Sequence, residues 1–175
     1  MYCKRAFLGI VAAASVAGMS TLLSNPGYAQ DVEAKVKTSM GALKSKAAKI
    51  GPAKIEGTEA VGGKAAPAIY FGSTKINNNF GLVDEVVKEN GGTATIFVKA
   101  GDEYVRVSTN VKKDDGSRAI GTILDPKGKA IVAIQKGEPF YGDVTILEKP
   151  YTTGYEPIRD ASNNVIGIYY VGYMK

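Results

Sequence analysis

The residues around Arg106 have the types and spacing that most directly suggest binding chemistry. Polar and apolar side chains alternate from residue 103 to residue 111, which is the period of a half-buried β-strand. One face of that strand would carry four polar or aromatic side chains, Tyr104, Arg106, Ser108 and Asn110. A guanidinium among such side chains can bind a carboxylate through two parallel hydrogen bonds. The alternation alone fits a solvated strand face equally well, so both interpretations stay open.

Aromatic residues gather between positions 140 and 155, where they could form the wall of a pocket. They are Phe140, Tyr141, Tyr151 and Tyr155. A tyrosine supplies an apolar surface and one hydroxyl, which suits a small polar ligand, although tyrosine also favours strands for ordinary packing. Tyr141 and Tyr155 are the stronger ligand-contact candidates. Tyr151 and Ser108 complete the predicted ligand-binding set around Arg106.

Catalysis and metal binding have little support in the sequence. The chain contains no histidine, and its single cysteine is Cys3, which excludes His-dependent triads and the usual zinc sites. The only dense acidic pair, Asp114 and Asp115, lies in a glycine-containing turn, and we expect Arg118 to pair with these acids rather than with a ligand. Gly62 and Gly63 lack the strand-to-helix context of a phosphate-binding loop. We therefore predict no catalytic residue, no metal and no cofactor.

The charge distribution argues against a nucleic-acid partner. Two of the 22 basic residues, Lys4 and Arg5, lie in the first 29 positions, which leaves 20 basic and 17 acidic residues in the remainder. The acids are spread among the bases, so no basic stripe forms. The charged residues are expected to be solvated surface.

The N-terminal 29 residues have the pattern of a secretory signal peptide. A short basic region at Lys4 and Arg5 precedes an apolar, alanine-rich run, and small residues at Gly27 and Ala29 fit a cleavage site after Ala29. An uncleaved membrane anchor is the alternative, because the apolar run is near the lower limit for spanning a bilayer. Cleavage would place the mature protein in the periplasm or outside the cell.

The remaining periodicity predicts an α+β domain. Helical spacing covers residues 31–50 and 80–90, and a weaker helix is expected at 127–136; residues 53–66 are predicted to be a loop or short extended pieces. Strands are expected in six segments, 68–71, 93–100, 103–111, 144–149, 151–159 and 165–173. These elements predict a long N-terminal helix on a central antiparallel sheet of five to six strands. Space for a ligand would lie on the other sheet face.

Five segments in order resemble the extracytoplasmic Cache sensor domains, in particular the single-Cache type described as a Cache 3/Cache 2 fusion. They are NNNFGLVDEVVKENGGTATIF, EYVRVSTNV, GSRAIGTILDP, GEPFYGDVTILEKPYTTGYEPIRD and NNVIGIYYVGY. The resemblance implies a PAS-like fold with a small-molecule pocket on one sheet face, the face that would carry Arg106. It suggests a division into a signal peptide (1–29), a helix and loop (30–66) and a Cache domain (67–175).

The resemblance also implies a sensory role, in chemotaxis or two-component signalling. Receptor Cache domains lie between two membrane helices, and no second apolar run of that length follows the last predicted strand. We therefore expect the domain to bind a small organic anion, such as a carboxylate, and to act through a membrane receptor or sensor kinase. The alternative is an interaction or structural module that has the fold without the pocket. The oligomeric state stays open.

Overall fold

The computed structural model describes residues 26–175, with side chains from Asp31 onward. The elements follow one another as α1 (Pro26–Ile50), β1 (Ala53–Val61), β2 (Lys64–Phe71), β3 (Thr74–Lys75), α2 (Gly81–Asn90), β4 (Thr93–Ala100), β5 (Glu103–Thr109), α3 (Lys129–Gln135), β6 (Phe140–Ile146), β7 (Lys149–Arg159) and β8 (Val165–Met174). The predicted cleavage site lies at the edge of this part of the chain. Most of the predicted signal peptide therefore lies outside the described residues, and its removal stays a prediction.

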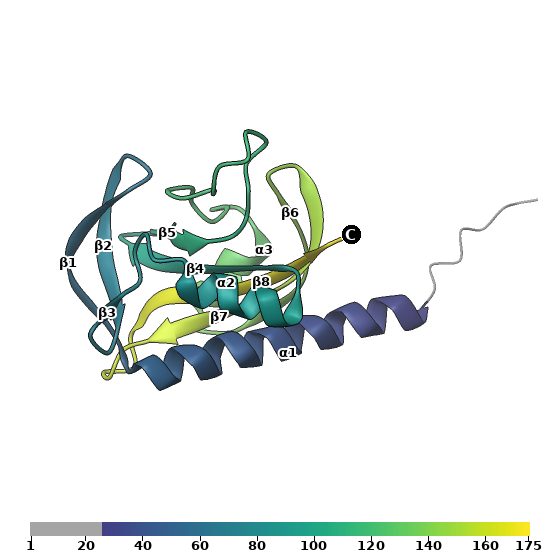
Figure 1. The fold of residues 1–175 in the computed structure, drawn as a ribbon, viewed down its shortest axis with the longest axis horizontal. Helices are drawn as coiled ribbons and strands as arrows, with labels where there is room; N and C mark the ends of the chain where they lie inside the picture. The colour runs from purple at the N-terminus through teal and green to yellow at the C-terminus, as the bar shows by residue number, and fades with distance from the viewer. Residues whose placement is uncertain (1–25) are drawn as a thin grey trace, which may run out of the picture.

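The central element is an antiparallel sheet of five strands, in the order β5-β4-β8-β7-β6. It confirms the predicted α+β fold class and the predicted size of the sheet. The long helix α1 runs along one face of this sheet, and α2 lies beside it (Figure 1). The loops and α3 cover the opposite face, so the sheet separates two hydrophobic clusters.

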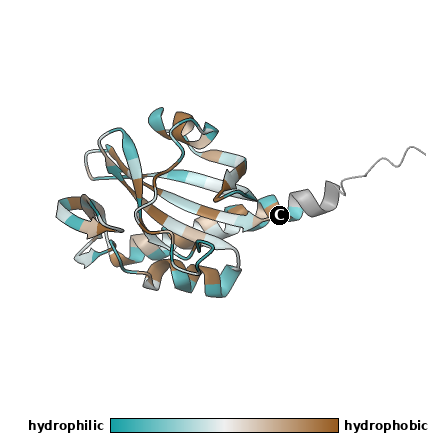
Figure 2. Cartoon of the chain, turned by 90° about the horizontal axis from the view of Figure 1, so that it is seen from above, coloured by the Kyte–Doolittle hydropathy of each residue, from teal (hydrophilic) through white to brown (hydrophobic). Residues whose placement is uncertain are grey.

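Helix α1 packs on the sheet through one apolar stripe. Val36, Met40, Leu43 and Ala47 are at most 1% exposed and recur at the three- and four-residue spacing of a helix face. Ile50, the last residue of α1, is 38% exposed. Brown hydrophobic and teal hydrophilic residues are interspersed along the helices and strands (Figure 2).

Residues 53–66, predicted to be a loop or short extended pieces, instead form the greater part of a regular β-hairpin. β1 and β2 pair along their lengths, and β3 completes a second sheet of three strands in the order β1-β2-β3. Most of β1 is exposed on both faces, so its sequence lacks the alternation that identifies a half-buried strand. The two-residue turn of Gly62 and Gly63 has positive φ angles of 57° and 82°, as the tight hairpin turns require.

The boundaries of β6 also differ from the prediction. The strand begins at Phe140 and ends at Ile146, four residues before the predicted start and three before the predicted end. Leu147 and Glu148 then make a tight turn at φ angles of 46° and 66°. Neither is a residue typical of such turns, so the sequence carried no signal for this hairpin.

An irregularity between β4 and β5 changes which side chains share a face. Ile96 pairs with Ser108, whereas its neighbour Phe97 pairs with Arg106, so one extra residue of β5 is left between them. This geometry is a β-bulge. Opposite residues in an antiparallel pair point to the same side of a sheet. Ser108 therefore lies on the helix side with Ile96, and Arg106 lies on the other side with Phe97.

Two glycine substitutions test the packing of the two layers. At Gly167 a Cβ atom would lie 2.4 Å from the Phe97 carbonyl oxygen, so Gly167→Ala should lower the free energy of unfolding by about 2 kcal/mol. Gly41 lies in α1 with no atom within 4 Å of a Cβ position, so Gly41→Ala should raise it by about 0.5–1 kcal/mol through helix propensity. Urea denaturation measures both, and equal effects would contradict the packing described here.

Candidate ligand-binding site

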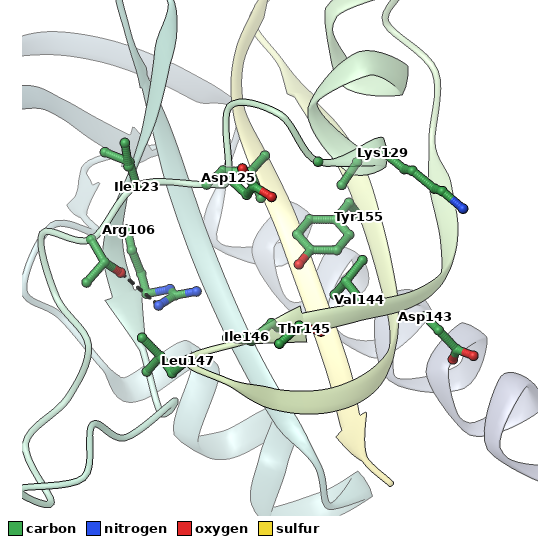
Figure 3. Close-up of a pocket in the computed structure, with 14 residues that line it drawn as sticks. Arg106, Ile123, Asp125, Lys129, Asp143, Val144, Thr145, Ile146, Leu147 and Tyr155 are labelled. Carbon is green, nitrogen blue, oxygen red and sulfur yellow. Dashed lines mark hydrogen bonds between the residues drawn. The ribbon is translucent and has the colours of Figure 1, made fainter.

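A cavity of about 460 Å³ opens on the face of the sheet opposite α1. Its walls are residues 122–125 and 128–130 on one side, and residues 143–146 of β6 with the following Leu147 on the other. Arg106 and Tyr155 project into it from β5 and β7 (Figure 3). A volume of this size is within the range of pockets that enclose small organic ligands.

Arg106 lies at one end of this cavity and is only 5% exposed. Its Nη1 donates a hydrogen bond of 2.8 Å to the Thr122 hydroxyl, and its guanidinium carbon lies 5.1 Å from the centre of the Phe97 ring. Its Nε is buried and has no hydrogen-bond partner among residues 26–175. Within residues 26–175, no carboxylate lies within 4.0 Å of this guanidinium. Desolvation lowers the pKa of Arg106, yet arginine stays charged in proteins.

Tyr155 faces Arg106 across the cavity and is 3% exposed (Figure 3). Its ring packs against that of Tyr170, with 4.9 Å between the ring centres and an interplanar angle of 51°. Burial raises the pKa of both tyrosines above the ordinary value of 10.0, and the nearby Arg106 charge opposes this only in part. Both phenols are therefore neutral at physiological pH, and the Tyr155 hydroxyl can donate a hydrogen bond.

The other charged residues of the cavity wall are either exposed to solvent or already paired with other groups of the protein. Asp143 forms an ion pair with Lys175 and accepts a hydrogen bond from the Thr152 hydroxyl; Lys175 lowers the pKa of this carboxyl group. Asp125 is exposed, and its Oδ1 accepts the Lys127 backbone N–H in a local turn. The Lys129 side chain extends away from the cavity (Figure 3). Arg106 is thus the buried charge of this site.

The structure places the predicted site residues in two groups. Arg106 and Tyr155 line the cavity, and Tyr151 belongs to the same buried cluster behind them without lining the cavity itself. Ser108 lies outside the cavity, because the β-bulge turns it toward the helix side, where its hydroxyl donates to the Asn79 carbonyl oxygen at 2.6 Å.

Tyr141 also lies away from the cavity. It pairs with Gly154, on the face of the sheet covered by α1, and its hydroxyl donates to Glu156. It borders a much smaller hollow, of about 110 Å³, against α1. The prediction placed Tyr141 before the strand began, whereas the observed start at Phe140 fixes its side of the sheet.

Arg118 has the structural role that the sequence indicated, with a different partner. Both of its terminal nitrogens donate to Asp84 of α2, at 2.7 and 2.8 Å, and Nη1 also donates to the Thr109 carbonyl oxygen. The guanidinium carbon lies 4.4 Å from the centre of the Phe80 ring. Asp115, one of the predicted partners, instead accepts hydrogen bonds from Ser117.

Sequence reasoning missed Thr122 and the wall formed by β6. Thr122 accepts the Arg106 hydrogen bond and donates its own to the Ala119 carbonyl oxygen at 2.8 Å, so its hydroxyl has a fixed direction. The only signal in the sequence was the glycine at position 121, within the GSRAIGTILDP segment, because glycine often marks a turn. In the structure Gly121 has a φ of 78° and makes a backbone turn directly before Thr122.

One comparison with known proteins is informative. The family model of the Cache 3/Cache 2 fusion domain matches residues 15–175. The chain belongs to this family. The match confirms the resemblance, and it extends further toward the N-terminus than the segments that suggested it. Cache domains are extracytoplasmic sensor modules, and this class describes the chain.

No curated protein matches the chain, so the ligand and the partner have no assignment from relatives. None of the helices in residues 26–175 is long and apolar enough to cross a bilayer. Within the same residues, no three His, Cys, Asp or Glu side chains form a group suited to a metal ion. The proposed division of the chain at residue 67 stays a prediction.

The buried phenols predict a loss of stability in alkaline solution. Tyr155 and Tyr170 have raised pKa values in the fold, so above about pH 10 the unfolded chain loses these protons first. The free energy of unfolding should therefore be constant with respect to these groups below pH 10 and then fall by up to about 1.4 kcal/mol per pH unit for each tyrosine. Urea denaturation between pH 8 and about 11 measures this slope. Tyr155→Phe should remove one tyrosine's share of it, and an unchanged slope would contradict the burial of this hydroxyl.

Proposed function

We propose that this Cache domain binds a small organic anion, with a carboxylate group held by Arg106, and reports its presence in the periplasm or outside the cell. The observation that carries the proposal is the buried Arg106 charge: among residues 26–175 it has one neutral side-chain hydrogen-bond partner, and no carboxylate lies within 4.0 Å of it. Removing a cation from water costs several kcal/mol when no opposite charge accompanies it. A ligand carboxylate supplies that charge.

The cavity is suited to hold such a ligand in a defined orientation. The Arg106 guanidinium is at one end, the Tyr155 hydroxyl can donate a second hydrogen bond, and Leu124, Ala130 and Ile146 provide apolar walls. Its volume of about 460 Å³ is many times the roughly 30 Å³ that one water occupies in the liquid. The cavity is therefore larger than a two-carbon acid, which is only a few times the size of a water molecule. We infer that the carboxylate is attached to a larger organic body.

The alternative, a structural module without a ligand, predicts that bulky side chains fill this face of the sheet. The cavity and its buried cation favour ligand binding over that alternative. Transmission of the signal is part of the same proposal. We infer that a membrane receptor or sensor kinase recognises the occupied domain, because the described helices include none that crosses a bilayer.

A thermal-shift screen tests the ligand class. Among small acids, lactate, succinate and citrate should raise the melting temperature of the protein more than the two-carbon acetate does, whereas amines and neutral sugars of similar size should not raise it. An amine or a sugar that stabilises the protein more than every acid would contradict the anion assignment. Stabilisation by no compound at all would favour the structural module.

Substitution of Arg106 tests the contact itself. Arg106→Lys keeps a positive charge but lacks the planar fork, so it should weaken binding of the best acid by about 2 kcal/mol, which is about thirtyfold in affinity. Isothermal calorimetry resolves this change. The unfolding free energy without ligand should change little, because no ion pair of residues 26–175 is lost.

Arg118→Lys is the matched control for this experiment. It replaces the paired contact with Asp84, so it should lower the unfolding free energy by about 1 kcal/mol and leave ligand affinity unchanged. Equal ligand affinities of wild type and Arg106→Lys would show that Arg106 does not contact the ligand. Unfolding of Arg106→Lys would identify Arg106 as a structural residue.

A further inference from the structure

Gly62, in the turn between β1 and β2, lies against Gly121, which directly precedes the cavity-lining residue Thr122. A Cβ atom on Gly62 would lie 2.5 Å from the Ile120 carbonyl oxygen and 2.9 Å from the Gly121 Cα. A Cβ atom on Gly121 would lie 2.8 Å from the Val61 carbonyl oxygen and 2.9 Å from the Gly62 Cα. These distances are too short for real Cβ atoms, so the two backbones are in direct contact with no space for a side chain between them.

The segment that receives this contact also fixes Arg106. Residues 119–124 run beside β5, where the Arg106 N–H donates to the Thr122 carbonyl oxygen and the Gly121 N–H donates to the Arg106 carbonyl oxygen, both at 2.9 Å. A third bond of 2.9 Å joins the Leu124 N–H to the Tyr104 carbonyl oxygen. Thr122, directly after Gly121, holds the Arg106 guanidinium through its hydroxyl. A displacement of Gly121 therefore moves the only side-chain hydrogen-bond partner of Arg106 among the described residues.

Asn78 forms a second connection between the hairpin and β5. Its side-chain amide donates to the Ala60 carbonyl oxygen of β1 at 2.9 Å, and its backbone N–H donates to the Val107 carbonyl oxygen of β5 at 2.8 Å. Val107 follows Arg106 in the chain. The hairpin is thus bound to both backbone segments that determine where the guanidinium lies.

We infer that Gly62 is a positioning residue for the ligand cavity: the β1–β2 turn sets the place of the segment 119–124 and, through Thr122, the orientation of Arg106. This inference rests on the proposed function only in assigning the cavity to a ligand. Neither β1 nor β2 contributes a residue to the cavity lining. Binding sites lose affinity when a charged group moves by even a fraction of an ångström, so a remote contact of this kind affects recognition.

Gly62→Ala and Gly63→Ala form a matched pair for the test. Both glycines have positive φ, 57° and 82°, so alanine introduces backbone strain at either position. Only at Gly62 does the new Cβ overlap the segment 119–124, because no atom lies within 4 Å of the Cβ position of Gly63. Any effect of Gly62→Ala beyond that of Gly63→Ala therefore comes from steric overlap with Ile120 and Gly121.

The first measurement uses the full chain without any ligand. Amide hydrogen exchange by NMR should be about tenfold faster at Gly121 and Leu124 in Gly62→Ala than in Gly63→Ala, while β7 and β8 amides exchange equally in both. The Arg106 Nε–Hε resonance should shift in Gly62→Ala and stay at the wild-type position in Gly63→Ala. Equal exchange and an unshifted Arg106 resonance in both variants would overturn the inference.

The second measurement is calorimetric binding of acetate, lactate, succinate and citrate. Gly62→Ala should weaken the best of these by about tenfold relative to Gly63→Ala, and it should weaken binding no further when Arg106→Lys is already present. A loss of the same size in both backgrounds would show a merely structural effect and overturn the inference. If none of the four binds to wild type, the proposed carboxylate ligand fails, and the exchange and resonance data still decide the role of Gly62.

Asn78→Gly carries the test if Gly62→Ala does not fold. Glycine keeps the positive φ of 58° at this position and removes only the side-chain bond to Ala60. The same two amides should exchange faster and the Arg106 resonance should shift. Wild-type values for both in Asn78→Gly would overturn the inference.

Discussion

The burial of one arginine charge constrains the architecture of the site. A guanidinium that is 5% exposed must be held by its surroundings, and within residues 26–175 Arg106 has an aromatic ring beneath it and a single hydroxyl beside it. A cation–π contact contributes about 0.5–2 kcal/mol and a hydrogen bond to a charged group about 1.5–3. Together these contribute about 2–5 kcal/mol, which is of the same order as the several kcal/mol that burial of a lone ion costs. The fold therefore holds the charge with little surplus, and an anion in the cavity would stabilise it further.

The surrounding structure determines where this charge can lie. The β-bulge opposite Ile96 and Phe97 separates Arg106 from Ser108, so that of these two residues Arg106 lines the cavity. Residues 119–124 then lie along the outer edge of β5, where they satisfy backbone groups that an edge strand would leave unpaired. The same three backbone bonds bring the Thr122 hydroxyl to the guanidinium. One irregularity in a strand pair and one glycine turn thus generate the polar end of the cavity.

The parts of this fold with strong periodicity could be predicted from the sequence. The inward face of α1, the β4–β5 hairpin and the strand Val165–Met174 all follow from spacing, and the family resemblance added the arrangement of the sheet. The β1–β2 hairpin could not be predicted, because a strand exposed on both faces has no pattern. Ser108 was misplaced because no residue type marks a bulge. Thr122 was missed because its importance comes from a backbone path that brings distant residues together, not from its neighbours in sequence.

The sheet also limits how strongly the cavity can be coupled to the long helix. On β7, Tyr155 projects into the cavity, while the next residue, Glu156, projects toward α1, where Lys44 and Tyr141 bind it. Two adjacent residues of β7 thus contact the cavity on one face of the sheet and α1 on the other. The Lys44 side chain is 47% exposed, however, and an ion pair of that kind contributes at most about 1 kcal/mol. A tenfold effect of ligand on a partner needs about 1.4 kcal/mol of coupling, so this contact alone is insufficient. The apolar packing of Val36, Met40 and Leu43 on the sheet would have to change as well.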